Sequence, residues 1–358
     1  MTSHYSRRAF LKAGTIFTSF GLTQQLCGSL AFAAPAAMDF GTVSFGVISD
    51  PHVDIKGVNE FKMSAGSVDC VAASVAALNQ HNELKFVMVC GDLLLDGEKE
   101  NAIAIKAELD KLKAPYFVVA GNHDFKPAKE TALRSGFNYM SIDDFVRFFR
   151  GHGYDKSGKR FYAQQIVPGL RVIGLDANLP GDTKWGGVLP DEQLQWLEHQ
   201  LSSHTDAMHV VFIHHNLVRW SADELEGGPK QWFTIDNAPQ VRALLSKYAA
   251  AVPVVISGHR HIGLNLRQIN GVNYFTSPSV NSHPMRFTIY DINKDGISWQ
   301  TQRVPMPTQF HLSARENMLN STWWRQSECA ERNSFTDEQV LDLYENNAMQ
   351  MGSMKLKS

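Results

Sequence analysis

Short apolar runs and amphipathic segments alternate along most of the chain. Continuous apolar runs at residues 43–49 and 86–90 predict buried strands, and residues 68–80 between them have apolar positions at helical spacing. The same pattern predicts helices at 98–112 and 190–201 and strands at 116–120 and 209–213. Regular alternation of strands with helices is typical of an α/β fold.

The pattern changes in the last third of the chain. Asn237 is expected to cap a helix that runs to residue 248, and a strand at 254–257 follows it. Tight turns and short alternating runs then predict a β meander with strands at 264–269, 273–276, 286–290 and 298–303. Beyond residue 307, a capping box from Thr336 to Gln339 indicates a helical tail.

A polar cluster follows each of five predicted strands. The clusters are Ser49-Asp50-Pro51-His52, Gly91-Asp92, Gly121-Asn122-His123-Asp124, His214-His215 and Gly258-His259-Arg260-His261. Because the carboxyl ends of strands in an α/β sheet share one edge, where ligands bind, the five clusters are expected to converge. Imidazole, carboxylate and amide groups without cysteine suit Zn, Mn or Fe rather than a thiolate structural zinc site.

In this order the clusters resemble the signature of the calcineurin-like metallophosphoesterases, over about residues 43–300. A single Asp-x-His or Gly-Asp occurs by chance in many proteins, whereas five ordered pieces at strand ends form a specific pattern. The resemblance implies an α/β fold of the metallophosphoesterase type, in which a β-sandwich is flanked by helices (αββα). It also implies two divalent metal ions, with Mn, Fe and Zn left open.

The resemblance assigns roles position by position. The implied ligands of one metal are Asp50, His52 and His261, and those of the other are Asn122, His214 and His259. Asp92 would bridge the two metals. His123, next to the ligand Asn122, would be the catalytic residue near the leaving group. His214 is preferred to His215 because the family's ligand directly follows its strand.

The implied ligand set leaves the site with excess positive charge. Two divalent ions bring four positive charges, and Asp50 and Asp92 bring two negative ones. That excess would bind a phosphoryl group and lower the pKa of a metal-bridging water, which supplies hydroxide for in-line attack. His123 could then act as general acid toward the departing alkoxide.

Departures from the family pattern narrow the subclass. Purple acid phosphatases have Tyr three residues after the bridging Asp, where this chain has Leu95. Protein Ser/Thr phosphatases have a Gly-Asp-x-Val-Asp-Arg-Gly run, and residues 91–97 lack its Arg. Too few residues follow the predicted meander for the second domain of a two-domain nucleotidase. The compact branch with cyclic-nucleotide and glycerophosphodiester phosphodiesterases remains, although Asn216 stands where many relatives have Pro, which leaves the substrate open.

These observations predict an exported di-metal phosphoric-ester hydrolase that acts as a phosphodiesterase on a small-molecule ester. A phosphomonoesterase is the nearer alternative, and a non-catalytic metal-binding module on the same fold is the other. Retention of every implied ligand together with His123 favours an enzyme.

Several residues near the predicted ligands have two interpretations. Hydrogen bonding to ligands and plain solvation are both open for Asp54, Asp96, Asp124, His215 and Arg260. A substrate pocket and simple packing are both open for Trp220, Trp232 and Phe233, which flank a Gly227-Gly228-Pro229 loop. Surface positions are expected for His81, His199, His204 and His209.

Composition adds two exclusions. The 358 residues include 34 Lys and Arg against 36 Asp and Glu, a net charge of -2, so no basic excess exists to bind nucleic acid. Cys70, Cys90 and Cys329 would remain after removal of an export signal, which allows one disulfide at most. Cys90 lies in an apolar run and is expected to be a buried small hydrophobe.

The N-terminus has the order of an export signal. Ser6-Arg7-Arg8-Ala9-Phe10-Leu11-Lys12 precedes an acid-free, apolar stretch, and the segment resembles a twin-arginine signal. Cleavage is expected after Ala33, which would leave a net charge of -5 because residues 1–33 hold three basic residues and no acid. Gln24 and Gln25 interrupt the apolar run, so no stable membrane anchor is expected.

The expected organisation is therefore a twin-arginine signal peptide at 1–33, a metallophosphoesterase domain at 34–306 and a helical tail at 307–358. The twin-arginine export machinery is the expected partner. The protein is expected in the periplasm or outside the cell.

Overall fold

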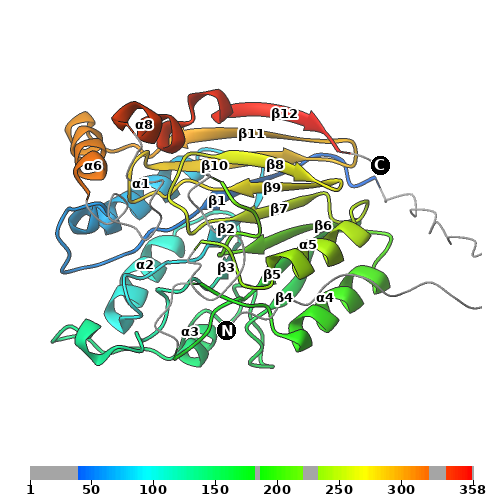
Figure 1. The fold of residues 1–358 in the computed structure, drawn as a ribbon, viewed down its shortest axis with the longest axis horizontal. Helices are drawn as coiled ribbons and strands as arrows, with labels where there is room; N and C mark the ends of the chain where they lie inside the picture. The colour runs from blue at the N-terminus through cyan, green and yellow to red at the C-terminus, as the bar shows by residue number, and fades with distance from the viewer. Residues whose placement is uncertain (1–38, 182–185, 221–232, 322–335, 357–358) are drawn as a thin grey trace, which may run out of the picture. The chain divides into compact units, whose positions relative to one another are not determined.

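Two six-stranded sheets face each other at the centre of the molecule (Figure 1). The computed structural model describes residues 39–181, 186–220, 233–321 and 336–356, all within one unit, Ala34–Ser358. The expected export signal, Trp232, the 227–229 loop and Cys329 lie outside the described residues. None of the described helices is long and apolar enough to cross a bilayer.

The first sheet has the strand order β12-β11-β10-β1-β2-β3. Its strands are β1 (Val43–Ile48), β2 (Leu84–Cys90), β3 (Tyr116–Val119), β10 (Arg286–Ile292), β11 (Gly296–Arg303) and β12 (Met351–Lys355). Strands β1, β2 and β3 are parallel, and β10, β11 and β12 extend the sheet in antiparallel fashion from β1.

The second sheet has the order β4-β5-β6-β7-β9-β8. Its strands are β4 (Tyr162–Val167), β5 (Leu170–Leu175), β6 (Met208–Ile213), β7 (Val254–Ser257), β8 (Asn265–Ile269) and β9 (Val272–Thr276). The four inner strands β5, β6, β7 and β9 are parallel, and each edge strand pairs in antiparallel fashion.

Helices flank the two sheets (Figure 1). They are α1 (Ser67–Leu78), α2 (Lys99–Leu109), α3 (Ile142–Phe148), α4 (Asp191–Ser203), α5 (Ala238–Lys247), α6 (Thr308–Asn320) and α8 (Asp337–Glu345). Short 3-10 turns lie at η1 (Ser64–Gly66), η2 (Glu130–Ala132) and η4 (Asn347–Met349). The arrangement confirms the predicted β-sandwich flanked by helices.

Side-chain alternation along β6 explains the layers. Val210 and Phe212 belong to the core between the two sheets, whereas Val211 and Ile213 belong to a second core with residues of α4 and α5. Successive side chains of a strand point to opposite faces, so one fully buried strand serves both cores. The ring of Phe212 lies edge-on to Phe45 of the first sheet, with centroids 6.0 Å apart.

The predicted meander is wrong in its topology. The four strands exist, but β8 and β9 belong to the second sheet, and β10 and β11 belong to the first. Local turns such as Asn270-Gly271, both with positive φ, define each hairpin. The sheet that a hairpin joins is decided by distant partners, β7 for β9 and β1 for β10.

The structure also adds elements that the pattern did not predict. These are helix α3 and strands β4, β5 and β12. The capping box at Thr336 is confirmed, because its side chain accepts from Gln339 N and the Gln339 side chain accepts from Thr336 N. The tail is nevertheless not purely helical, since β12 forms an edge of the first sheet against β11.

Asn237 takes the N-cap position of α5, but its side chain does not cap the helix. Its Oδ1 accepts from Leu189 N at 3.0 Å and its Nδ2 donates to Leu189 O at 2.8 Å. The side chain therefore ties α5 to the segment before α4.

Candidate metal centre

Five loops at the carboxyl ends of parallel strands form the site. Asp50 and His52 follow β1, Asp92 follows β2, Asn122 and His123 follow β3, His214 follows β6, and His259 and His261 follow β7. Main-chain hydrogen bonds join neighbouring loops, from His52 N to Asp92 O at 2.9 Å and from Gly258 N to His214 O at 3.0 Å. Between the sheets, His259 N donates to Asp50 Oδ1 at 3.0 Å, so the ligand loops of the two sheets meet at the site.

The backbone in these loops is unusual. Five of the seven predicted ligands have positive φ, from 39° to 69°: Asp50, His52, Asp92, His259 and His261. Residues with a Cβ seldom adopt the left-handed region, and such outliers concentrate at functional sites. The fold therefore holds these side chains in place at a conformational cost.

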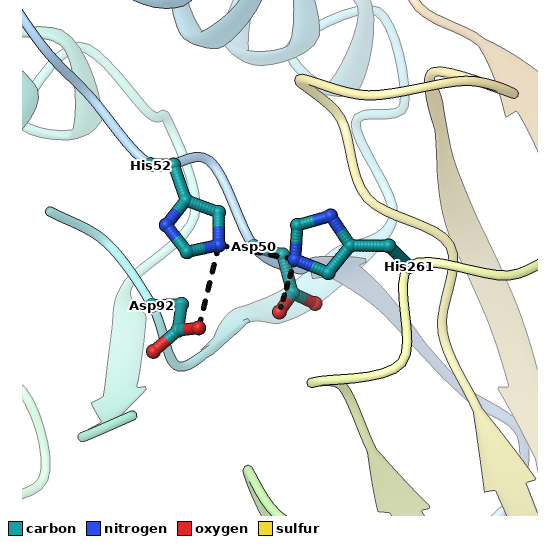
Figure 2. Close-up of side chains that lie close together, drawn as sticks. All are labelled: Asp50, His52, Asp92 and His261. Carbon is teal, nitrogen blue, oxygen red and sulfur yellow. Dashed lines mark hydrogen bonds and ion pairs between the residues drawn. The ribbon is translucent and has the colours of Figure 1, made fainter. Parts of the chain in front are cut away.

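Asp50, His52, Asp92 and His261 form one buried cluster, in which one atom of each side chain lies within 4.8 Å of the others (Figure 2). His52 Nε2 lies 3.0 Å from His261 Nε2 and 3.3 Å from Asp92 Oδ2. His261 Nε2 lies 3.3 Å from Asp50 Oδ1. We call Asp50, His52 and His261 the first half-site.

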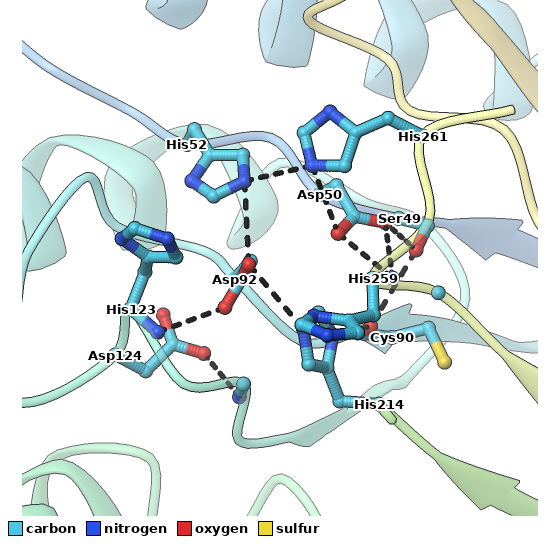
Figure 3. Close-up of polar contacts among 12 residues, drawn as sticks. Ser49, Asp50, His52, Cys90, Asp92, His123, Asp124, His214, His259 and His261 are labelled. Carbon is cyan, nitrogen blue, oxygen red and sulfur yellow. Dashed lines mark hydrogen bonds and ion pairs between the residues drawn. The ribbon is translucent and has the colours of Figure 1, made fainter. Parts of the chain in front are cut away.

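A second cluster contains Asp92, His214 and His259 (Figure 3). His214 Nε2 lies 3.3 Å from Asp92 Oδ2 and 3.2 Å from His259 Nδ1. Asp92 is common to the two clusters, so the same carboxylate oxygen faces both. We call Asn122, His214 and His259 the second half-site.

The residues present fit two divalent metals. Two carboxylates and four imidazoles converge in a buried space, which is a donor set suited to Zn, Mn or Fe. Asn122 Oδ1 is buried and has no hydrogen-bond partner among the described residues. A buried amide oxygen without a partner is costly, and a cation beside it would satisfy it.

The three imidazoles that present Nε2 to the clusters have a partner at Nδ1. His52 Nδ1 lies 3.2 Å from Leu94 O, and His214 Nδ1 lies 2.9 Å from Cys90 O. His261 Nδ1 lies 2.8 Å from the side-chain oxygen of Ser282. Such contacts orient an imidazole so that its other nitrogen can bind a metal.

Neighbouring groups in the clusters shift one another's pKa. Burial acts to raise the pKa of Asp92, but His214, His123 and His52 together hold that pKa well below its usual value. Burial acts to lower the pKa of His214, yet Asp92 raises that pKa to about 9. Burial lowers the pKa of His52 well below its usual value, and Lys62 lowers it further. The acidic groups are thus ionised and ready to bind cations.

His123 lies beside both half-sites without belonging to either cluster (Figure 3). Its backbone N donates to Asp92 Oδ1 at 2.9 Å. Its ring Nδ1 lies 2.6 Å from Leu95 O and 2.9 Å from Asp96 Oδ1. The side chain is 18% exposed and lines a cavity, so a substrate can reach it.

A cavity of about 390 Å³ opens over the two half-sites. Its apolar lining includes Val58, Phe61, Leu95 and Phe233. This volume falls in the ordinary range for small-molecule sites. Phe233 therefore lines the pocket, whereas Trp220 packs in the second core and donates from Nε1 to Asn216 Oδ1 at 2.9 Å.

The sequence pattern missed two cations of this cavity. Lys62 Nζ lies 3.0 Å from His52 Nδ1, and Arg134 pairs with the buried carboxylates of Asp54 and Glu98. Neither cation lies in a strand-end motif. Their contacts join residues 10 to 80 positions apart, and no local signal could have found them.

The flanking residues are mostly buried. Asp124 accepts from Leu94 N at 2.9 Å and from Gly121 N at 2.7 Å, so it shapes the loops that carry Asp92 and Asn122. The guanidinium carbon of Arg260 lies 4.4 Å from the centre of the Phe233 ring. Plain solvation does not describe the buried members of this group: Asp54, Asp124, His215 and Arg260.

The expected surface position of His209 is wrong. His209 lies on β6, an inner strand of the second sheet, and is fully buried. Burial lowers its pKa to about 4. His199 is exposed as expected, and His81 and His204 are partly exposed.

Known proteins with similar sequences include phosphodiesterases and a diphosphatase. The protein is 28% identical to a probable glycerophosphodiester phosphodiesterase of Arcobacter nitrofigilis, over 76% of this chain and 90% of the relative. It is 24% identical to a 3',5'-cyclic adenosine monophosphate phosphodiesterase of Escherichia coli, over 71% and 82% of the two chains. It is 26% identical to a manganese-dependent ADP-ribose/CDP-alcohol diphosphatase of Arabidopsis thaliana, over 64% and 84%.

Solved structures share the fold. A dimetal phosphatase from Danio rerio superposes on this protein with a TM-score of 0.58 at 19% sequence identity. The superposition covers 72% of this chain and 95% of the phosphatase chain. The family model described as calcineurin-like phosphoesterase matches residues 43–263, the part of the chain that holds both half-sites. The chain therefore belongs to the calcineurin-like phosphoesterase family and is a metal-dependent phosphoesterase.

Proposed function

We propose that the protein is a phosphodiesterase in which the first half-site binds one divalent metal, the second half-site binds the other, and Asp92 bridges them. The observation that carries the proposal is the position of Asp92 Oδ2, 3.3 Å from His52 Nε2 on one side and 3.3 Å from His214 Nε2 on the other. A carboxylate oxygen in this position could bind a cation on each side, as in two-metal sites.

Two features support a diester as the substrate. The cavity of about 390 Å³ has room for organic groups on both sides of a phosphorus atom, and much of its wall is apolar. The relatives named above include enzymes whose names specify glycerophosphodiesters and a cyclic nucleotide. We therefore place the substrate among small glycerophosphodiesters and cyclic nucleotides.

The chain's own residues divide the work of the reaction. Two bound divalent ions would supply Lewis-acid activation of water and of the phosphoryl oxygens. Lys62 adds a positive charge to the same cavity, which favours an anionic ester. His123, oriented by Leu95 O and Asp96, is placed to give a proton to the departing alkoxide.

The substrate class is tested with metal-free protein reconstituted with Mn²⁺ or Zn²⁺ and assayed against mono- and diesters with matched organic groups. We expect higher kcat/KM on the diesters, with glycerophosphodiesters and cyclic nucleotides among the best substrates. Higher kcat/KM on the monoesters would replace the proposal with a phosphomonoesterase. Two bound metals without hydrolysis of any ester would identify a non-catalytic module.

We also propose that the protein is exported through the twin-arginine route. The support is the Arg7-Arg8 pair ahead of an acid-free apolar stretch that ends in Ala31-Phe32-Ala33. Replacing both arginines with lysine keeps the charge but removes the pair, and we expect unprocessed precursor to accumulate in the cytoplasm. Lys12→Arg serves as the charge-matched control. Unchanged periplasmic yield of the double variant would contradict this route.

A further inference from the structure

Helix α8 lies against the loop that carries His261. Gly263 N donates to Leu343 O at 3.2 Å, and a Cβ at Gly263 would come within 2.7 Å of Tyr344 O. Just after the helix, Asn346 Nδ2 donates to Leu264 O at 2.7 Å. The helix therefore packs on the chain two to three residues beyond a predicted metal ligand.

A second connection runs through aromatic rings. The ring of Tyr344 lies edge-on to Phe61 with centroids 6.2 Å apart, and the Phe61 ring lies 5.7 Å from the His261 ring. Tyr344 and Phe61 are 1% and 8% exposed. In a close-packed interior, removing one ring leaves its neighbour free to shift.

A third connection is polar. Glu345, the last residue of α8, has Oε1 3.3 Å from His283 Nε2 and 3.4 Å from Arg315 Nε. His283 follows Ser282, whose Oγ lies 2.8 Å from His261 Nδ1. The carboxylate thus lies against the segment that orients the imidazole of His261.

We propose that α8 is a positioning element for the first half-site, and that Tyr344 and Glu345 set its metal affinity by holding His261. All three connections converge on this one ligand. The helix lies beyond residues 43–263, so the role is a feature of this chain outside the part that matches the family. In Figure 1, β12 (red) lies along β11, and α8 (also red) lies beyond the end of β11, next to α6.

The second half-site is held differently. His214 directly follows an inner strand, and its Nδ1 faces a main-chain oxygen, Cys90 O, at 2.9 Å. His259 N donates to Asp50 Oδ1 at 3.0 Å. This bond holds His259 to the loop after β1, upstream of the contacts of α8 at Gly263 and Leu264, so loosening α8 should weaken metal binding more at the first half-site than at the second.

The test isolates each half-site and measures Mn²⁺ binding by calorimetry on metal-free protein. His214→Ala leaves the first half-site, and His261→Ala leaves the second. We expect Tyr344→Ala to weaken Mn²⁺ binding about 10- to 100-fold in the His214→Ala background, the usual effect of losing a group that supports a ligand. In the His261→Ala background the affinity should change less than twofold.

Three further variants control for general destabilisation. Tyr344→Phe keeps the ring and should keep the wild-type affinity. Glu345→Gln removes a charge with little change in volume and should weaken only the first half-site, whereas Asp342→Asn removes the same charge from an exposed position of α8 and should have no effect. Equal losses at both half-sites, or no loss at the first with either Tyr344→Ala or Glu345→Gln, would overturn the proposal.

Discussion

The two half-sites share Asp92 but differ in the support of one histidine each, His261 in the first and His214 in the second. In the second half-site, the Nδ1 partner of His214 is a main-chain oxygen of the neighbouring strand β2. In the first, the Nδ1 partner of His261 is the side chain of Ser282, and a C-terminal helix packs beyond it. A main-chain partner survives almost any substitution, whereas a side-chain partner does not. Metal affinity in this protein should therefore be tunable at the first half-site and resistant to change at the second.

Loss of the Asp92 carboxylate should abolish metal binding at both half-sites, and with it any difference in their metal affinity. In Asp92→Ala the two metals would repel one another across a short gap without a negative charge between them. We expect neither half-site to retain metal through purification, as measured by elemental analysis. Asp96→Ala, which removes a nearby carboxylate that contacts His123 instead of the clusters, is the control. Two metals per chain in Asp92→Ala would refute the bridging role.

Substitution of His123 should leave both half-sites loaded while slowing the reaction. Hydrolysis of an alkyl diester by His123→Ala should fall by about 10²- to 10⁴-fold, the usual contribution of a positioned general acid. A nitrophenyl diester should lose much less, because nitrophenolate departs without a proton. The measurement is kcat on both esters beside the metal content.

The two possible failures of this prediction have different meanings. Equal losses on the two esters with metals retained would reject the general-acid role. Loss of one metal would show instead that His123 supports the loop that carries Asn122.

Removal of the Ser282 hydroxyl should weaken metal binding at the first half-site only. Ser282→Ala deletes the partner of His261 Nδ1, and Mn²⁺ binding at the first half-site should weaken about 10- to 100-fold while the second is unchanged. Calorimetry in the His214→Ala and His261→Ala backgrounds distinguishes the two. Ser74→Ala removes a buried hydroxyl that donates to Cys70 O within α1 and is the matched control. An equal loss of Mn²⁺ affinity in Ser282→Ala and Ser74→Ala would contradict a specific role of Ser282 at the first half-site.

The last prediction concerns the visible spectrum of the iron-loaded protein, in which we expect no change from tyrosine coordination. The described residues that line the cavity include no tyrosine, and Leu95 stands three residues after Asp92. Iron loaded into either half-site should therefore give no tyrosinate charge-transfer band in the visible spectrum. Such a band in the iron-loaded protein would mean that a tyrosine reaches one of the metals.

The sequence predicted the cluster positions well because each lies directly after a strand. A short apolar run followed by a polar turn is a local signal, and the shared edge of an α/β sheet brings such turns together. Residues such as Lys62, Ser282 and Tyr344 carry no local signal. Their roles follow from contacts across the fold. Tyr344 lies in the C-terminal tail, where the sequence pattern predicted a helix from its capping box but no contact with the site.

The prediction that His209 lies at the surface was wrong because its pattern is local and its burial is not. A histidine at the start of an apolar run, beside a helix end, is an ordinary surface pattern. Its burial follows from the place of β6 between β5 and β7, which depends on strand order. The predicted meander of hairpins β8–β9 and β10–β11 was wrong for the same reason. Turn residues define a pair of strands but not the sheet to which the pair belongs.

The positive φ angles at five ligands have a consequence for the stability of the metal-free protein. A residue with a Cβ gives up about 1 kcal/mol or more in the left-handed region, whereas Gly has no Cβ and avoids this cost. Gly at Asp50, His52, Asp92, His259 or His261 would therefore relieve backbone strain but remove the donor atom that a metal needs. Backbone stability and metal binding thus make opposite demands at these five positions.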